Sequence, residues 1–346
     1  MNGSDAGAGA DAGADAGADA GGRAEAEGGA EADLAGDAFA WLPATIVSSV
    51  AQSPRARSLT LAVPGLRPAR AGQHVDLRLT ADDGYTAVRS YSLSDVRASG
   101  AAVDVADAAH AGGAADAGGA ALAGGAAHAG GAGRVPQVEV TVERLDDGEV
   151  SPYLVDAAEP GDPVEVRGPI GGWFVWPPTE FEPDSAVHAV LPEPEGATPP
   201  TSAPVQLIGG GSGVAPLMAM VRARGRGAPT MRLLASVRDP GSRWFVAELD
   251  EAARASSADV ARRAGGGEQP AGLAVDWVYS RVAPEGHGRA AGRLTRNELE
   301  RLVLPASEHP LVYVCGANSF VAVVAAWLVE LGHAPTRVRT ERFGGV

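Results

Sequence analysis

The chain has 346 residues and a net charge of −15 at pH 7. This length suits two domains of ordinary size, and the acidic balance argues against a nucleic-acid-binding protein. All 28 basic residues are arginines, and Cys315 is the sole cysteine. The sequence therefore excludes a phosphate-binding loop that ends in Gly-Lys, a Schiff-base lysine, an internal disulfide and a thiolate zinc or cysteine-ligated iron–sulfur site built within the chain.

The first segment, residues 1–37, repeats Asp, Ala and Gly. Its nine acidic residues and one basic residue, Arg23, account for −8 of the net charge of −15. This composition buries too little apolar surface to offset chain entropy, which predicts a disordered acidic tail. The segment shows no secretory signal and the chain has no apolar run of about 18 residues, so we expect a cytoplasmic protein without a membrane span.

Residues 40–176 contain six short segments in which apolar and polar residues alternate between Pro and Gly turns, as in antiparallel strands. No convincing helical pattern occurs among them. Because closure removes exposed edges from short strands, we expect a six-stranded antiparallel Greek-key β-barrel. The predicted strands are residues 44–50, 57–63, 72–79, 89–93, 137–145 and 162–168.

Two stretches of biased composition interrupt the order of elements. Residues 98–134, rich in Ala and Gly, separate two strands and predict a disordered insertion at a loop tip. Their His110 and His128 fit no metal-ligand spacing, so no metal site is predicted. The proline-rich residues 177–204 predict a linker to a second domain.

Residues 205–346 alternate short apolar runs with amphipathic segments, which predicts βαβ units and a parallel-sheet α/β domain. Residues 256–272 are expected to form a loose insertion in this domain. The predicted strands are residues 205–210, 231–237, 273–279 and 311–316, and the predicted helices are residues 215–224, 244–255, 295–303 and 320–331.

The first strand of the second domain runs into the turn GGGSGVAP, residues 209–216. Glycines allow a backbone to approach a pyrophosphate, and the following helix N-terminus supplies free N–H groups. The carboxyl end of such a strand is also the usual ligand crevice. The turn is either a nucleotide-binding loop or a plain turn; its candidate binding residues are Gly210, Gly211, Gly213, Ala215 and Pro216.

Two later strands of this domain also end in residues with useful chemistry. Ser280 and Arg281 offer a hydroxyl and a guanidinium that suit an adenosine phosphate, or they form a solvated strand end. Cys315 ends another predicted strand and Gly316 turns into a helix. The cysteine is either a small buried apolar residue or a thiol that faces the same crevice.

Six motifs in this order resemble those of the ferredoxin–NADP reductase superfamily, particularly its bacterial flavin reductases. The resemblance covers residues 41–346 apart from the insertions, and Ala317 stands where the family has proline after Cys-Gly. The motifs are RSYSLSD (residues 89–95), GEVSPYL (148–154), GPIGGWFVW (168–176), GGGSGVAP (209–216), CGAN (315–318) and ERFGG (341–345).

The resemblance implies FAD on the barrel domain. Arg89 would pair with the flavin pyrophosphate, Tyr91 would pack on the isoalloxazine, and the Ser92 hydroxyl would lie near flavin N5. Phe343 would cover the ring until a nicotinamide displaces it. The FAD-binding residues so implied are Arg89, Ser90, Tyr91, Ser92, Gly148, Val150, Ser151 and Phe343.

The resemblance also implies hydride transfer from NADPH or NADH bound to the α/β domain, with Ser92, Cys315 and Glu341 as catalytic residues. Ser280 and Arg281 are similar to the pair with which NADPH-using relatives hold the 2′-phosphate. Electrons would leave to a separate acceptor protein, a ferredoxin or an oxygenase component, with no nucleic acid or membrane involved.

Three alternatives remain open from the sequence. FMN-binding relatives use similar strand motifs, so FMN competes with FAD. The chain is alternatively a flavin-binding electron-transfer subunit with little NAD(P)H activity of its own. A third possibility is a nucleotide-binding interaction module without flavin.

Overall fold

The computed structural model describes residues 40–96, 135–178, 202–225, 228–263 and 272–343, with side chains up to residue 256 in the helix that ends at Arg263. These residues belong to one unit, Phe39–Val346. The predicted tail 1–37, the predicted insertion 98–134 and most of the predicted linker 177–204 lie outside the described residues.

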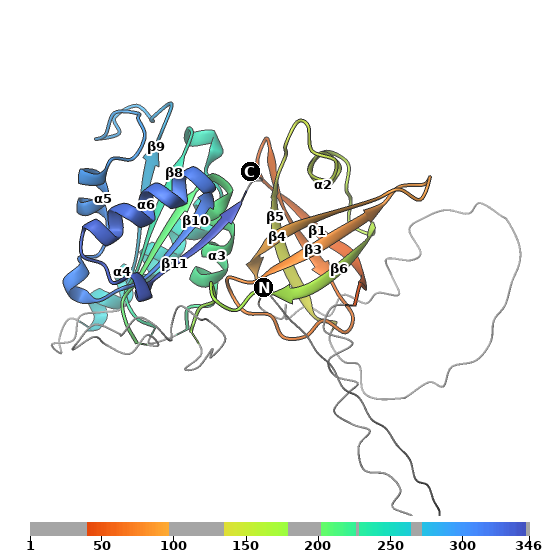
Figure 1. The fold of residues 1–346 in the computed structure, drawn as a ribbon, viewed down its shortest axis with the longest axis horizontal. Coiled ribbons are helices and arrows are strands. Elements are labelled where there is room, and N and C mark those ends of the chain that lie inside the picture. The colour runs from red at the N-terminus through yellow and green to blue at the C-terminus, as the bar shows by residue number, and fades with distance from the viewer. Residues whose placement is uncertain (1–39, 97–134, 179–201, 226–227, 264–271, 344–346) are drawn as a thin grey trace, which may run out of the picture. The chain divides into compact units, whose positions relative to one another are not determined.

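The first described domain is a barrel in which six antiparallel strands pair in the closed order β1-β2-β5-β4-β3-β6 (Figure 1). Strand β6 returns to lie beside β3, which is Greek-key order, as predicted. Alternating side chains such as Ile46, Leu61 and Val140 are fully buried and fill the interior. The strands are β1 (Leu42–Ser53), β2 (Ala56–Ala62), β3 (His74–Thr80), β4 (Thr86–Asp95), β5 (Gln137–Glu143) and β6 (Pro163–Ile170).

A short helix, α2 (Ser151–Asp156), joins β5 to β6. Pro152 lies in its first turn, where the missing N–H breaks no helical hydrogen bond. Leu154 and Val155 are buried in the barrel core. The expectation that this domain contains no helix is therefore wrong, because six residues are too few for a helical period to be visible in the sequence.

The second domain is a parallel sheet in the order β11-β10-β7-β8-β9. Four of its strands lie where the apolar runs predict them. The edge strand β11 was not expected, because the charged residues in VRTERF mask its alternation. The strands are β7 (Val205–Gly210), β8 (Met231–Val237), β9 (Leu273–Tyr279), β10 (Leu311–Ala317) and β11 (Val338–Phe343).

Helices cover both faces of this sheet (Figure 1). Leu217 of α3 (Val214–Arg222) and Leu249 of α4 (Val246–Arg263) belong to one core cluster. Leu299 of α5 (Arg296–Leu302) and Leu328 of α6 (Asn318–Glu330) belong to the other. Because α4 continues to Arg263, residues 256–263 are helical and the expected loose insertion is wrong over that range. Residues 264–271 lie outside the described part of the chain.

Candidate functional site

A cavity of about 950 Å³ lies where the parallel strands end. Gly210, Val237, Ser280 and Ala317 line it from the carboxyl ends of β7, β8, β9 and β10. This is the edge at which open α/β sheets bind ligands. The barrel contributes lining residues from the β1–β2 turn and the end of β5, namely Ser53, Pro54, Arg55, Glu143 and Leu145.

The glycine-rich turn depends on side chains being absent. A Cβ atom on Gly213 would lie 2.2 Å from the backbone oxygen of Cys315, and one on Gly210 would lie 2.7 Å from the Phe320 ring. Gly211 has φ +57°, in the left-handed region that favours glycine. Gly210 and Gly211 line the cavity, whereas Gly213, Ala215 and Pro216 are buried behind it at the start of α3.

The cavity wall carries groups that suit phosphates. Of the predicted pair, Ser280 lines the cavity, whereas Arg281 is exposed and is not among the lining residues. Its backbone N–H instead donates to the Arg238 carbonyl at 2.9 Å, which brings the two chain segments side by side. The lining arginines are Arg55, Arg238 and Arg293, and the lining serines are Ser53, Ser212, Ser236, Ser242, Ser280 and Ser319.

Strand β4 brings the predicted flavin residues to the other domain. The Ser92 side chain is buried, and its hydroxyl donates to Glu341 Oε1 on β11 at 3.0 Å. Tyr91 is largely buried, which raises the pKa of its phenol to about 12. Phe343, two residues after Glu341, lines the cavity. Ser92 and Glu341, 249 positions apart in sequence, therefore meet at one point.

Glu341 is a buried carboxyl group. Desolvation raises its pKa to about 7, although the hydrogen bond from Ser92 opposes the shift. Its Oε2 atom is buried without a hydrogen-bond partner among the described residues. The adjacent Cys315 pairs with Glu341 in the β10–β11 register and is fully buried. Burial raises the pKa of this thiol, so Cys315 is protonated, and it lies outside the lining of the cavity.

The raised pKa of Glu341 predicts a pH-dependent stability. The folded chain holds this proton between the ordinary pKa near 4.5 and about 7, where the unfolded chain releases it. The free energy of unfolding therefore falls as pH rises through this window. Glu341→Gln removes the effect. We therefore expect the free energy of unfolding of this variant, relative to that of the unmodified flavin-free protein, to rise by about 1–3 kcal/mol between pH 5 and pH 8. Melting temperatures of both proteins at the two pH values measure this change. Exposed Glu300→Gln is the control, and an equal offset at both pH values contradicts the prediction.

The segment before α2 packs against Arg89 on β4. Arg89 Nη2 donates to Glu149 Oε2 at 2.6 Å, and both side chains are half exposed. Ser151, the first residue of α2, is buried and accepts the Leu145 N–H at its hydroxyl at 3.0 Å. Val150 is buried and precedes the helix. The structure thus brings Arg89 together with the Gly148–Ser151 segment through Glu149.

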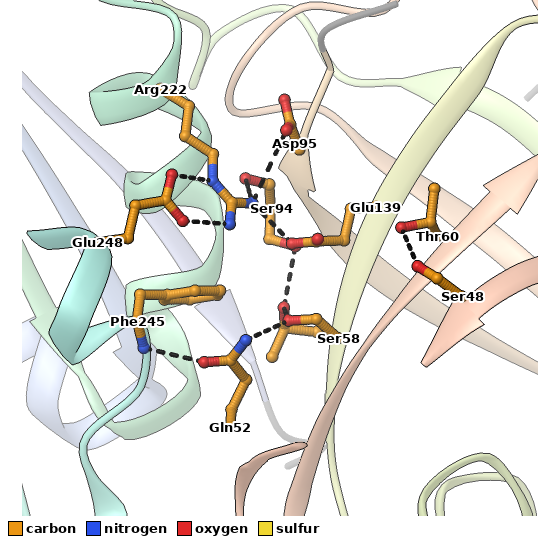
Figure 2. A network of polar contacts seen from close by, with 11 residues as sticks. Ser48, Gln52, Ser58, Thr60, Ser94, Asp95, Glu139, Arg222, Phe245 and Glu248 are labelled. Carbon is orange, nitrogen blue, oxygen red and sulfur yellow. Dashed lines mark hydrogen bonds and ion pairs between the residues drawn. The ribbon is translucent and has the colours of Figure 1, made fainter. Parts of the chain in front are cut away.

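Arg222 of α3 connects the two domains at a second point (Figure 2). Its Nη1 donates to Glu139 Oε1 on β5 at 2.6 Å and to the Ser94 carbonyl on β4 at 3.0 Å. Its Nε and Nη2 pair with both oxygens of Glu248 on α4. The Arg222 side chain is only 8% exposed. Ser94 lies two residues from Ser92, so this ion pair anchors the strand that carries the predicted flavin residues.

A chain of hydroxyl groups continues from this ion pair into the barrel (Figure 2). Ser94 donates to Glu139 at 2.7 Å, and Thr141 donates to Ser94 at 2.9 Å. The chain continues through Ser58 and Gln52 to the backbone N–H of Phe245 in the α/β domain. The sequence gives no local signal for this network, since its members come from strands β1, β2, β4 and β5 and from the segment before α4.

The amino-acid sequence has two curated relatives of the same kind, and no family model matches it. The flavohemoprotein of Bacillus subtilis (strain 168) is 23% identical over 282 residues, which is 80% of this chain and 51% of the relative. The flavohemoprotein of Rhodopirellula baltica is 28% identical over 216 residues, 61% of this chain and 44% of the relative. The chain spans about half the length of the curated relatives it matches.

Solved structures with the same architecture include the flavohem-like FAD/NAD-binding domain of nitric oxide dioxygenase from Vibrio cholerae O1 biovar El Tor. It has a TM-score of 0.56 and 20% identity, and the match covers 88% of this chain and 99% of that one. A ferredoxin NADP⁺ reductase from Neisseria gonorrhoeae, solved with bound FAD and NADP, has a TM-score of 0.56 and 15% identity over 87% of this chain and 98% of its own. The chain therefore has the two-domain fold of the ferredoxin–NADP reductase-like FAD/NAD-binding proteins.

Proposed function

We propose that the protein is an FAD-dependent oxidoreductase that takes hydride from NAD(P)H and passes electrons to a separate redox partner. The observation that carries this proposal is the contact between Ser92 on the barrel and Glu341 on the α/β sheet, beside the cavity residue Phe343. A site for two cofactors that react with each other needs this junction of a flavin domain and a nucleotide domain.

The residues present fit both cofactors. Gly210 and Gly211 leave backbone exposed at the cavity wall, and a side chain on Gly210 would collide with Phe320. Arg238 and Arg293 line the same wall, where guanidinium groups suit phosphates. On the barrel, Arg89 offers a half-exposed guanidinium two residues before the apolar ring of Tyr91. The guanidinium of Arg89 suits a diphosphate, and the aromatic side chain of Tyr91 suits the face of a flat ring.

A bound flavin would accept the hydride of a reduced nicotinamide and release electrons to an acceptor. The chain supplies alignment and electrostatics. Tyr91 would pack against the ring, and Arg89 would hold the diphosphate. The Ser92 hydroxyl, which donates to Glu341 in this structure, would turn its proton toward the ring nitrogen on which negative charge develops. Cys315, the neighbour of Glu341 in the β10–β11 register, stays a neutral thiol because burial raises its pKa.

The proposal is tested by purification and a steady-state assay. The protein should release FAD on denaturation and should reduce ferricyanide with NADPH or NADH. FMN alone in the released material would contradict the FAD assignment. Flavin bound without nucleotide-dependent turnover would favour the electron-transfer subunit. A colourless protein that does not take up added FAD would favour the interaction module.

The nucleotide preference is a separate prediction. Arg238 and Arg293 line the cavity with Ser280, so we expect NADPH to be preferred over NADH by about tenfold in kcat/KM, the effect of one charged hydrogen bond. Arg238→Ala should remove most of this margin and leave NADH turnover nearly intact. Arg281→Ala tests whether the exposed neighbour contributes. Equal kcat/KM for the two nucleotides in the unmodified protein contradicts the prediction.

A further inference from the structure

An acidic side chain occupies the position where the predicted diphosphate-binding arginine presents its donors. Glu149 Oε2 accepts from Arg89 Nη2 at 2.6 Å, and Glu149 Oε1 accepts from the Tyr85 hydroxyl at 3.2 Å. Arg89 Nη1 donates to the Val88 carbonyl at 2.7 Å. Both terminal nitrogens of the guanidinium are thus engaged within the chain itself.

The backbone holds Glu149 close to Arg89. Its neighbour Val150 is buried, and Ser151 is fixed by the N–H of Leu145. On the other side, a Cβ atom on Gly148 would lie 2.8 Å from Ser151 Oγ, so this turn is closely packed. The acid therefore cannot move far from Arg89 by a shift of its backbone, and rotation of one of the two half-exposed side chains releases the guanidinium.

We propose that Glu149 competes with the flavin diphosphate for Arg89 and so sets the affinity of this chain for FAD. The inference rests on the proposed function, in which Arg89 holds the diphosphate. Glu149 occupies a donor of Arg89 Nη2, so a phosphate that binds through the two terminal nitrogens must displace the carboxylate or share Arg89 with it. A carboxylate that stays in place also adds negative charge beside the diphosphate.

The size of the effect follows from exposure. The side chains of Arg89 and Glu149 are 49% and 51% exposed, so their ion pair is only modestly stable. We therefore expect Glu149→Gln to tighten FAD binding by about three- to fivefold, which is the range of an exposed ion pair. The competition tunes flavin affinity and does not prevent binding.

The test measures the dissociation constant of FAD for the full chain after flavin removal, by quenching of FAD fluorescence. Glu149→Gln should bind FAD about three- to fivefold more tightly. Asp147→Asn, which removes an exposed charge two residues earlier in the same segment, should bind FAD like the unmodified protein. Riboflavin carries no phosphate, and its affinity should be the same in all three proteins.

Repeating the Glu149→Gln substitution in a protein that lacks Arg89 tests whether Glu149 acts through this arginine. With Arg89→Ala, most of the gain from Glu149→Gln should disappear, because Glu149 then has no arginine to mask and only its repulsion of the diphosphate remains. A gain of equal size in both backgrounds, an equal gain for riboflavin, or no gain at all overturns the inference. Failure of the unmodified chain to bind FAD overturns the proposed function instead, so the two failures are distinguishable.

Discussion

Arg222→Met should lower the melting temperature of the protein by roughly 5–10 °C, corresponding to about 3 kcal/mol. Methionine keeps the volume of the aliphatic stem and removes the charge. Glu139, whose side chain is 17% exposed, then loses the cation that offsets its burial, and the Ser94 carbonyl loses its donor. The loss is smaller on the side of Glu248, which is 42% exposed and can be hydrated.

The matched control is Arg254→Met on α4. Arg254 pairs with Glu251, and these side chains are 70% and 67% exposed, so this substitution should change stability by less than about 1 kcal/mol. Arg222→Lys should recover only part of the stability, because an ammonium cannot form the paired contacts to Glu248. If Arg222→Met and Arg254→Met shift the melting temperature equally, the buried ion pair does not hold the domains together.

Arg89→Ala should weaken FAD binding by about ten- to a hundredfold. A charged hydrogen bond to a phosphate contributes about 1.5–3 kcal/mol, and each 1.4 kcal/mol is a factor of ten in the dissociation constant. Because Arg89 is half exposed and already paired with Glu149, we expect a value near the lower end. The dissociation constant is measured by fluorescence quenching with the flavin-free protein.

Two comparisons sharpen this result. Arg89→Lys should bind FAD with intermediate affinity, since it keeps the charge and loses the fork. Arg57→Ala, on β2 of the same barrel, removes an arginine that donates to Ser49 and should leave FAD binding unchanged. Unaltered FAD affinity in Arg89→Ala would show that the diphosphate lies elsewhere.

The fold was largely predictable because both domains have strong periodic patterns. The six barrel strands alternate clearly, and four strands of the α/β domain are short apolar runs, as in VQLIGG. The elements that sequence reasoning missed are those in which local signals are weak. Helix α2 spans six residues, strand β11 is charged, and the last turns of α4 resemble a loop in composition.

The candidate site was predictable where motifs occupy strand ends. Gly210, Gly211, Ser280 and Phe343 line one cavity, as a common crevice requires. The contacts of Arg222 and the lining residue Arg293 were not foreseen, because each depends on how distant segments pack. Arg281 follows a strand at the same edge of the sheet but is not among the lining residues, and its role in nucleotide binding stays a prediction.

The central claim is that NAD(P)H reduces a flavin held between the two domains, and anaerobic stopped-flow absorbance tests it most directly. The FAD-loaded protein is mixed with NADPH or NADH, and the visible absorbance band of the oxidised flavin is followed within a single turnover. The account predicts that the band bleaches in an exponential phase whose rate saturates with nucleotide concentration, faster with NADPH than with NADH. A flavin band that persists with both nucleotides, in protein that retains its FAD, would contradict the account.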